Sequence, residues 1–324
     1  MNHTFPPEDV VFHLNEGLPQ LVSVTEKERL LREGTSYARL LTPEAAPVWG
    51  AAFDQLLPLL APRTAGLVAR VTAQIAAHHS RPLLVSLARG GTPAGALLRR
   101  AAARQGLDWP HHSLSIMRDE GLDLVAYREI LAAHPDREVI FVDGWTGKGS
   151  IRGALDRSVP GARLAVLSDP AGVSTYAGTF QDVLLPHALL NATVCGLLSR
   201  TFLEGDGRHA VRIEAGLQPH DRTRAYLDVV SQAVPVAIVP GLRPVNPFAA
   251  TQGVAAQYGV TEPHRIKPSV GEASRVLLRR APAGLLLRQT GHPDTQHLET
   301  HAHACAVPVH VHADLPYQAC ALIR

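Results

Sequence analysis

The sequence predicts an α/β protein in which a parallel sheet flanked by helices is followed by a second, small α/β domain. Three observations support this prediction. Apolar runs as long as buried strands, such as 82–87 and 163–168, alternate with patterns typical of helices. Prolines at 235, 240, 244 and 247 interrupt this alternation, as expected of a linker. The length of 324 residues is sufficient for two domains.

The first domain is predicted over residues 63–234, after a helical N-terminal extension at 1–62 that covers it. Leu67, Val71 and Ile75 have the spacing i, i+4, i+8, which places them on one face of a helix. Strands and helices then alternate along the chain, at 82–87 (strand), 93–104 (helix), 112–116 (strand), 122–133 (helix), 139–142 (strand), from 151 (helix) and at 163–168 (strand).

The second domain is predicted over 264–324, after a linker at 235–263. Ser269 and Glu272 form a capping-box pattern that starts a helix at 273–280. The remaining elements are a strand at 284–288, a helix at 293–304, a strand at 307–311 and an apolar segment at 319–324 that joins the sheet.

Composition excludes several classes of protein. The formal net charge of +2 does not favour a polyanionic partner for the whole molecule. Cys195, Cys305 and Cys320 contain no CxxC pair and imply no disulfide framework. The N-terminus has no cationic, apolar leader, and no apolar run reaches the length of a membrane span. We therefore expect a soluble, cytoplasmic protein.

The loop after the strand at 139–142 is the most informative segment. Asp143 stands at the strand end, where α/β sheets bind ligands, and can contact sugar hydroxyls. A glycine-rich loop that leads into a helix offers backbone N–H groups to a phosphate. The spacing does not fit a Walker A loop, because only Trp145 and Thr146 separate Gly144 from Gly147 and Lys148. The candidate ribose-phosphate residues here are Gly144, Thr146, Gly147, Lys148, Gly149 and Ser150.

A second anion loop follows the strand at 82–87. Glycines allow close approach of a ligand to the backbone, and Arg89 can bind a diphosphate with two N–H groups. The alternative is an ordinary turn with a surface arginine. The candidate residues are Ser86, Arg89, Gly90, Gly91 and Thr92.

Further candidates are less specific. Arg118 lies in a charged segment that either closes over a diphosphate or is a surface loop. Asp169, Asn191 and Thr193 can form an acceptor pocket, or can be polar groups of a packed region.

Two alternatives involve cysteine chemistry. Cys195 can be a nucleophile with His187 or His209 as base, although no local signature supports this and the residue fits a buried apolar position. His297, His301 and Cys305 share one helical face and are candidate metal ligands.

The two anion loops together resemble the type I phosphoribosyltransferases, which bind phosphoribosyl diphosphate (PRPP). In segments 141–149, 190–194 and 197–201 the sequence is similar to a bacterial family from tellurite-resistance and stress gene clusters, sometimes labelled cysteine protease StiP. That family joins an orotate-phosphoribosyltransferase-like domain to a Pelota-type RNA-binding domain. Segments 266–280 and 314–324 resemble this second domain.

The resemblance implies Mg²⁺-dependent transfer of phosphoribose from PRPP to a base-like acceptor, in a stress-response role and as a homodimer. Asp143, Arg89 and Arg118 would be catalytic, with Asp143 also a metal ligand. The Pelota-like domain would bind structured RNA through basic residues at one helix, Lys267, Arg275, Arg279 and Arg280. Gly144 replaces the second acid of the type I motif, which favours as an alternative an RNA-binding regulator that senses PRPP without turnover. A cysteine protease is a remote alternative.

Overall fold

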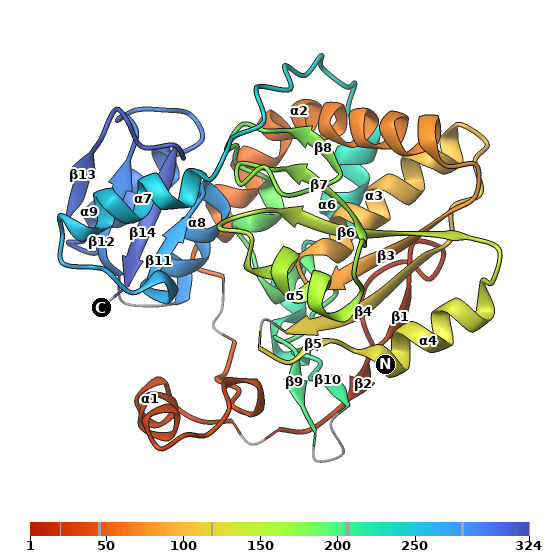
Figure 1. Ribbon diagram of the computed structural model, residues 1–324, viewed down its shortest axis with the longest axis horizontal. Coiled ribbons are helices and arrows are strands. Elements are labelled where there is room, and N and C mark those ends of the chain that lie inside the picture. The colour runs from red at the N-terminus through yellow and green to blue at the C-terminus, as the bar shows by residue number, and fades with distance from the viewer. Residues whose placement is uncertain (20, 45–46, 118, 205–207, 280–281, 324) are drawn as a thin grey trace.

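The expected fold class is confirmed: a central parallel sheet is flanked by helices and accompanied by a second, small α/β domain (Figure 1). The computed structural model describes residues 1–324 except 20, 45–46, 118, 205–207, 280–281 and 324. Within the described residues, no helix is long and apolar enough to cross a membrane.

The main sheet has the strand order β1-β4-β3-β6-β7-β8, and each neighbouring pair on this path is parallel. The short β5 pairs antiparallel with β4. The strands are β1 (Val11–His13), β3 (Pro82–Ala88), β4 (His111–Met117), β5 (Gly121–Leu122), β6 (Glu138–Trp145), β7 (Arg163–Ser168) and β8 (Tyr176–Thr179).

Two layers of helices cover the two faces of this sheet (Figure 1). One layer comprises α2 (Gly50–His78), α3 (Gly91–Arg104) and α6 (Thr223–Gln232), and the other α4 (Leu124–Ala133) and α5 (Ser150–Ser158). Alternate residues of β3 serve the two layers, because Leu84 packs in the core with α2 and α3 whereas Leu83 and Val85 pack in the core with α4 and α5. Burial on both faces explains the continuous apolar runs of the sequence.

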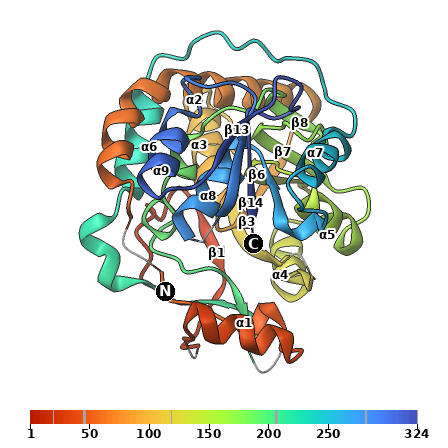
Figure 2. The same cartoon turned by 90° about the vertical axis from the view of Figure 1, so that its left-hand side faces the viewer.

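The N-terminal region differs from the helical extension expected at 1–62. Its β1 pairs with β4 at the sheet edge, and β2 (Asn15–Glu16) pairs with β10 (His209–Val211), which also pairs with β9 (Phe202–Leu203). The first helix, α1 (Val24–Arg32), lies at the bottom of the molecule in Figure 2. The predicted stripe of Leu67, Val71 and Ile75 is buried on α2, as expected.

The C-terminal domain contains a four-stranded sheet with the order β11-β14-β12-β13. Its elements are α7 (Pro247–Ala256), β11 (Ile266–Pro268), α8 (Val270–Arg279), β12 (Pro282–Leu287), α9 (Gln296–Ala304), β13 (Val309–Val311) and β14 (Ala319–Ile323). Helix α7 lies within the expected linker 235–263 and contacts β11. The Ser269 hydroxyl accepts a hydrogen bond from the Glu272 N–H at 3.3 Å, in agreement with the predicted cap.

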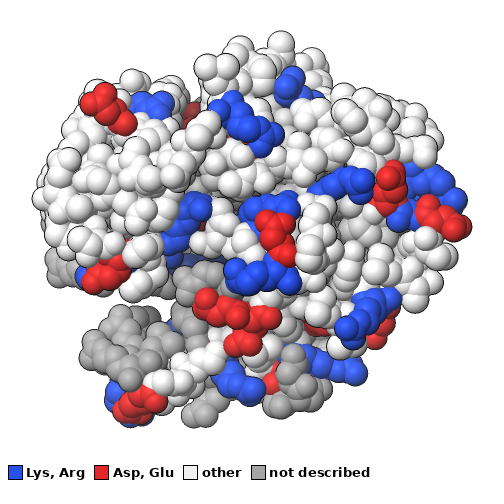
Figure 3. Space-filling model, in the orientation of Figure 1, with Lys and Arg blue, Asp and Glu red and all other residues white. Residues whose placement is uncertain are grey.

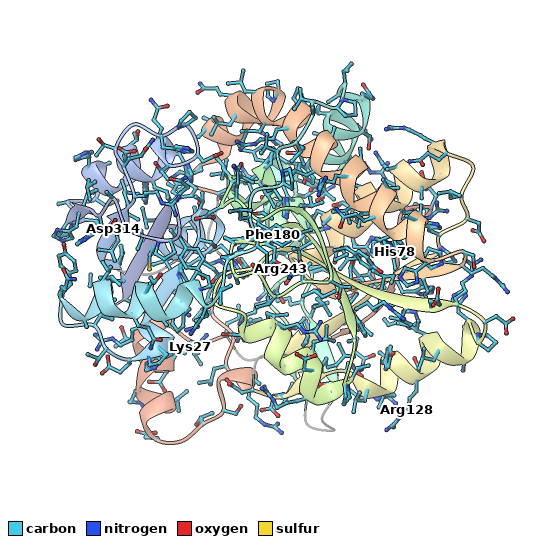
Figure 4. The ribbon with its side chains drawn as sticks, turned by 45° about the horizontal axis from the view of Figure 1, so that its top comes forward. Lys27, His78, Arg128, Phe180, Arg243 and Asp314 are labelled. Carbon is cyan, nitrogen blue, oxygen red and sulfur yellow. The ribbon has the colours of Figure 1, made fainter. Side chains whose placement is uncertain are left out.

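The segment between α6 and α7 arches over one side of the molecule (Figure 2). Arg243 anchors it, because its guanidinium group donates to the carbonyl oxygen of Gly172 at 2.8 Å and lies 4.6 Å from the ring centre of Phe180. Figure 4 shows these two labelled side chains next to each other. The connection is therefore held on the first domain along its length.

The two domains share one apolar core. The same cluster of buried side chains includes Phe53 and Leu57 of α2 and Val270 and Leu298 of the C-terminal domain. Buried Asp182 reinforces the contact by accepting hydrogen bonds from the backbone N–H groups of 270 and 318, both at 2.9 Å. Burial raises the pKa of Asp182 to about 7.

Helix α8 packs closely against the first domain. A Cβ atom added to Gly271 would lie 2.5 Å from ring atoms of Trp145, so only glycine fits at this crossing. The contact brings one face of α8 against the segment that contains the short 3₁₀ turns at Pro186–Ala188 and Ala192–Val194. The other 3₁₀ turns are at Tyr37–Arg39, Ala215–His220 and Pro263–Arg265.

Candidate functional site

A small cavity lies where the two domains meet. Its volume of about 20 Å³ is sufficient for one water molecule. It is closed by the loop after β3, the end of β6, the two 3₁₀ turns and α8. The lining residues are Arg89, Gly90, Trp145, His187, Ala188, Leu190, Asn191, Cys195 and Arg275.

The loop after β3 brings Arg89 and Gly90 to this cavity. The chain turns directly from β3 into α3, which begins at Gly91. A Cβ atom at Gly91 would lie 2.2 Å from the carbonyl oxygen of Val142, so glycine allows α3 to start against β6.

The other residues of this predicted loop face the interior. The Ser86 hydroxyl lies 2.7 Å from Nε2 of His111, and the Thr92 hydroxyl lies 2.8 Å from that of Ser113. All are buried. Their polar groups therefore connect strands and helix, whereas Arg89 is the charged residue that this loop contributes to the cavity.

The charge of Arg89 is compensated by Glu44, from the segment before α2. The Arg89 Nη2 atom lies 2.8 Å from Glu44 Oε1, and Arg279 of α8 pairs with the other carboxylate oxygen. The Arg89 Nη1 atom also donates to the Leu198 carbonyl at 2.6 Å. The side chains of Glu44 and Arg89 are only 5% and 6% exposed, so this is a buried ion cluster built from both domains.

The pKa directions reflect the crowding of positive charge. Burial would raise the pKa of Glu44, but Arg89 and Arg279 outweigh it and hold the pKa below its ordinary value. Burial, together with Arg89, lowers the pKa of Arg279 to about 9. Arg275, one helical turn before Arg279, lies with its guanidinium carbon 5.9 Å from the ring centre of Trp145.

His187 and Cys195 lie on the opposite wall. The His187 Nδ1 atom is 2.9 Å from the hydroxyl oxygen of Tyr226, while its Nε2 atom is buried without a hydrogen-bond partner. Burial, and secondarily Arg275, lowers the pKa of His187 to about 3, so the ring is neutral. Burial raises the pKa of the Cys195 thiol to about 11, although Arg89 and Arg275 act in the opposite direction.

The second predicted anion loop, after β6, is covered by the C-terminal domain. The ammonium group of Lys148 contacts the carbonyl oxygens of Pro263 and Ile266, and the Tyr317 hydroxyl donates to the Gly147 carbonyl at 3.0 Å. Gly149, with φ of +85°, precedes α5, which begins at Ser150. This loop joins the domains. It also borders a wider hollow of about 310 Å³, lined by Lys148, Ala171, Gly172, Val173, Pro244, Val245, Asn246, Pro247, Phe248 and Tyr317.

Asp143 lies within β6 near its end, because the strand continues to Trp145. Its Oδ1 atom accepts a hydrogen bond from the Gly144 N–H at 2.8 Å and is 3.6 Å from where a Cβ of Gly90 would be. Enclosure of the carboxyl group raises the pKa of Asp143 to about 7, while the Gly144 N–H and Arg275 act to lower it.

The predicted acceptor residues do not form one pocket. Asp169 accepts from the Thr146 hydroxyl at 2.7 Å and from Ser174, and is fully buried. Asn191 lines the small cavity. Thr193 is buried, and its hydroxyl has no hydrogen-bond partner. Arg118 lies outside the described residues.

The predicted RNA-binding arginines of α8 face the first domain. Arg279 pairs with Glu44, and Arg275 lies over Trp145. Lys267 is on β11, away from this pair, and Arg280 lies outside the described residues. Basic and acidic side chains are interspersed on the face shown in Figure 3, as expected from the small net charge. Of the two described arginines, Arg279 is thus paired with the first domain, whereas the Arg275 side chain is 39% exposed.

The possible metal ligands of the C-terminal domain have protein partners. His297 Nε2 lies 2.9 Å from the Ser274 hydroxyl, and His301 Nδ1 accepts from the Trp49 indole N–H at 3.3 Å. Among the described residues, no group of three or more His, Cys, Asp or Glu side chains is arranged to hold a metal ion.

Comparison with known proteins identifies two families. Residues 3–231 match the family model described as tellurite-like stress resistance cysteine protease StiP, and residues 245–324 match the model of the PELOTA RNA binding domain. The chain is 32% identical over 361 residues to a protein of Acinetobacter baylyi named cysteine protease StiP, with 99% of this chain and 94% of that protein covered.

These matches contradict the predicted Mg²⁺-dependent phosphoribosyltransferase, because the matched family and relative are named for a hydrolase. The transferase and PRPP assignments are therefore wrong. The glycine-rich loops misled the prediction, since such loops also serve as tight turns that dock two domains. The sequence signal that points to the protease alternative is that Cys195 is the single cysteine between residues 3 and 231, the segment that matches the family. The chain belongs to the StiP family of tellurite-like stress resistance cysteine proteases.

Proposed function

We propose that the protein hydrolyses peptide bonds with Cys195 as nucleophile and His187 as general base. The observation that carries this proposal is that the two side chains line the same cavity. The family description and the name of the Acinetobacter relative support it. Cys305 and Cys320 lie outside the residues that match the protease family.

His187 suits the role of base better than His209, the other histidine considered. The Nδ1 atom of His209 contacts the Ser115 hydroxyl at 2.8 Å, and the residue does not line the cavity. His187 is held by Tyr226 through Nδ1, which leaves Nε2 as the unpaired atom. When Nδ1–H donates to the tyrosine oxygen, the lone pair of Nε2 can accept a proton.

The reaction follows the general scheme of cysteine hydrolases. The sulfur of Cys195 attacks the carbonyl carbon of the peptide while its proton moves to His187 Nε2. The imidazolium ion then protonates the departing amine, and a thioester remains. Water, deprotonated by His187, attacks the thioester, which releases the carboxylic acid and returns the proton to the thiol. Asn191 and Arg275 are the polar cavity residues available to stabilise the oxyanion.

The structure represents a resting state of such a site. The pKa values of about 11 for the thiol and about 3 for His187 make proton transfer unfavourable by on the order of 10 kcal/mol. The cavity has room for one water and excludes a peptide. Catalysis therefore requires that the domain interface opens and admits substrate.

The first test uses a thiol-reactive peptide probe and a panel of unstructured peptides. Cys195→Ala should abolish cleavage and any labelling that persists in the Cys305→Ala protein, and His187→Gln should lower the rate of cleavage at least a hundredfold, since general base catalysis contributes ~10²–10⁴-fold. Cys305→Ala is the matched control, because this cysteine is exposed and distant in sequence. Cleavage that survives in Cys195→Ala would refute the proposal.

We also propose that the C-terminal domain binds RNA, on the support of its match to the PELOTA RNA binding domain. Because Arg275 and Arg279 face the first domain, the contact would involve other residues, among them Lys267 of β11. Lys267→Glu should weaken binding of a structured RNA and reduce its salt dependence, whereas Arg275→Gln should not. Unchanged RNA affinity in Lys267→Glu would exclude this surface.

A further inference from the structure

Glu44 lies between two arginines next to the candidate active site. It belongs to the segment between the 3₁₀ turn Tyr37–Arg39 and α2, and its side chain ends between Arg89 of the first domain and Arg279 of the second. The Glu44 side chain is 5% exposed. Arg89 lines the cavity that contains Cys195, so the carboxylate lies immediately behind the wall of the candidate active site.

The cluster carries more positive than negative charge. Arg275 adds a third guanidinium group, which pairs loosely with Glu272 at 3.5 Å. Buried Glu214 is a second nearby acid; it lies 3.9 Å from Arg212, and burial raises its pKa. One of its carboxylate oxygens has no hydrogen-bond partner. Glu44 is thus the principal counter-charge of Arg89 and Arg279.

Arg89 is held by two oxygen atoms from different segments. Its Nη2 atom lies 2.8 Å from Oε1 of Glu44, which is the charged partner of this guanidinium group. Nη1, by contrast, makes a short bond to the Leu198 carbonyl. The guanidinium group is therefore fixed on one side by a backbone carbonyl, and on the other side it binds a carboxylate, the position that a ligand carboxylate could take.

We propose that Arg89, Arg275 and Arg279 form a carboxylate-binding subsite beside Cys195, that Glu44 fills this subsite in the resting protein, and that peptide substrates with a carboxylate near the scissile bond displace it. The proposal rests on the proposed function, because it names the substrate class of that site. Glu44 acts as an intramolecular substitute for the substrate carboxylate and keeps the cavity closed.

Charge balance explains why the substrate must be acidic. A neutral peptide that displaced Glu44 would leave two buried guanidinium groups without a counter-ion, which is strongly unfavourable. A carboxylate restores the same pairing. The ligand carboxylate can come from an acidic side chain or from the end of a peptide, because both present the same two oxygen atoms to the arginines.

The test measures binding in the full-length Cys195→Ala protein, where turnover cannot interfere. Three fluorescent peptides share one sequence: one has a central Glu and blocked termini, one a central Gln and blocked termini, and one a central Gln and a free terminal carboxylate. The Glu peptide should bind at least tenfold more tightly than the blocked Gln peptide. The third peptide shows whether a terminal carboxylate serves as well.

Glu44→Gln in the same background should raise affinity for the Glu peptide at least tenfold, because the competing carboxylate is removed. Arg279→Met should lower it by a similar factor and leave binding of the blocked Gln peptide unchanged. Glu33→Gln is the matched control, since this glutamate is exposed on the same N-terminal region and pairs only with Arg29 among the contacts described.

If the Cys195→Ala protein that retains Glu44 binds the Glu peptide and the blocked Gln peptide with equal affinity, the proposal is overturned. This result does not depend on whether the Glu44→Gln variant folds. Different results would contradict the carboxylate-binding subsite and the proposed protease activity. Cleavage of neutral peptides as fast as acidic ones overturns the subsite and leaves the protease intact. Selective binding of acidic peptides without any cleavage by the native protein supports the subsite and removes the proposed activity.

Discussion

The loops after β3 and β6 look alike in sequence and have different environments in the structure. Both follow neighbouring parallel strands, contain glycines and carry one cation, Arg89 or Lys148. Arg89 lies beside a closed cavity and is paired with a buried carboxylate. Lys148 instead contacts two backbone carbonyl oxygens of the C-terminal domain.

The difference arises from what the second domain brings to each loop. Helix α8 brings Arg275 and Arg279 toward the first loop, which concentrates charge there. The region around β11 and Tyr317 brings neutral oxygen atoms to the other loop, which satisfies its cation and its backbone. A glycine-rich loop at a strand end therefore acquires its role from the surface packed against it.

The comparison of the two loops predicts that mutations in them lower the free energy of unfolding by different amounts. Arg89→Met should lower the free energy of unfolding by about 3 kcal/mol, because it leaves Glu44 buried with Arg279 as its remaining ion-pair partner. Urea unfolding monitored by tryptophan fluorescence measures this loss. Much of it should be recovered in the double variant with Glu44→Gln, which removes the unpaired carboxylate.

The matched change in the second loop is Tyr317→Phe. It removes the hydrogen bond to the Gly147 carbonyl and keeps the buried ring, so we expect a loss of about 1 kcal/mol. If both variants lose the same stability, the first loop is not a distinct charged centre and the comparison is wrong.

Acidification should affect the region around the first loop through His187. Its pKa of about 3 in the folded protein lies below the ordinary value of 6.5, so between these pH values only the unfolded chain binds the proton. The stabilisation that results from keeping His187 neutral is present above pH 6.5 and is lost as the pH falls toward 3. At pH 5 this histidine alone should cost about 2 kcal/mol relative to neutral pH.

The measurement compares native protein with His187→Gln at pH 7 and pH 5. The native protein should lose about 2 kcal/mol more than the variant on acidification, because the variant has no imidazole to protonate at this position. Identical losses would show that His187 is not held neutral by burial.

Local patterns predicted the main strands and helices because burial on both faces requires continuous apolar runs. The short β1 was missed, since Val11–His13 provides only three residues and derives its stability from the pairing with β4. Helix α7 was missed because prolines flank it, although Pro247 occupies a tolerated first position.

The site could be predicted only in part. Strand ends converge at one edge of the sheet, so Asp143 lies beside Gly90, and Arg89 lines the same small cavity as Asn191. Glu44 and Arg279 are 235 residues apart, and no local pattern connects them. Cys195 was considered as a nucleophile and judged unsuitable because its neighbours are apolar, which is also the reason that its thiol is protonated in the folded state.

The shared core of the two domains has a consequence for synthesis on the ribosome. The first domain emerges earlier, and the apolar surface around Phe53 and Leu57 stays exposed to water until residues of α8 and α9 have been translated. Arg275 arrives with the same segment and completes the wall around Cys195. A nascent or prematurely terminated chain thus carries Cys195 and Arg89 without Arg275 and Arg279, and translation of α8 determines when the wall of this cavity is complete.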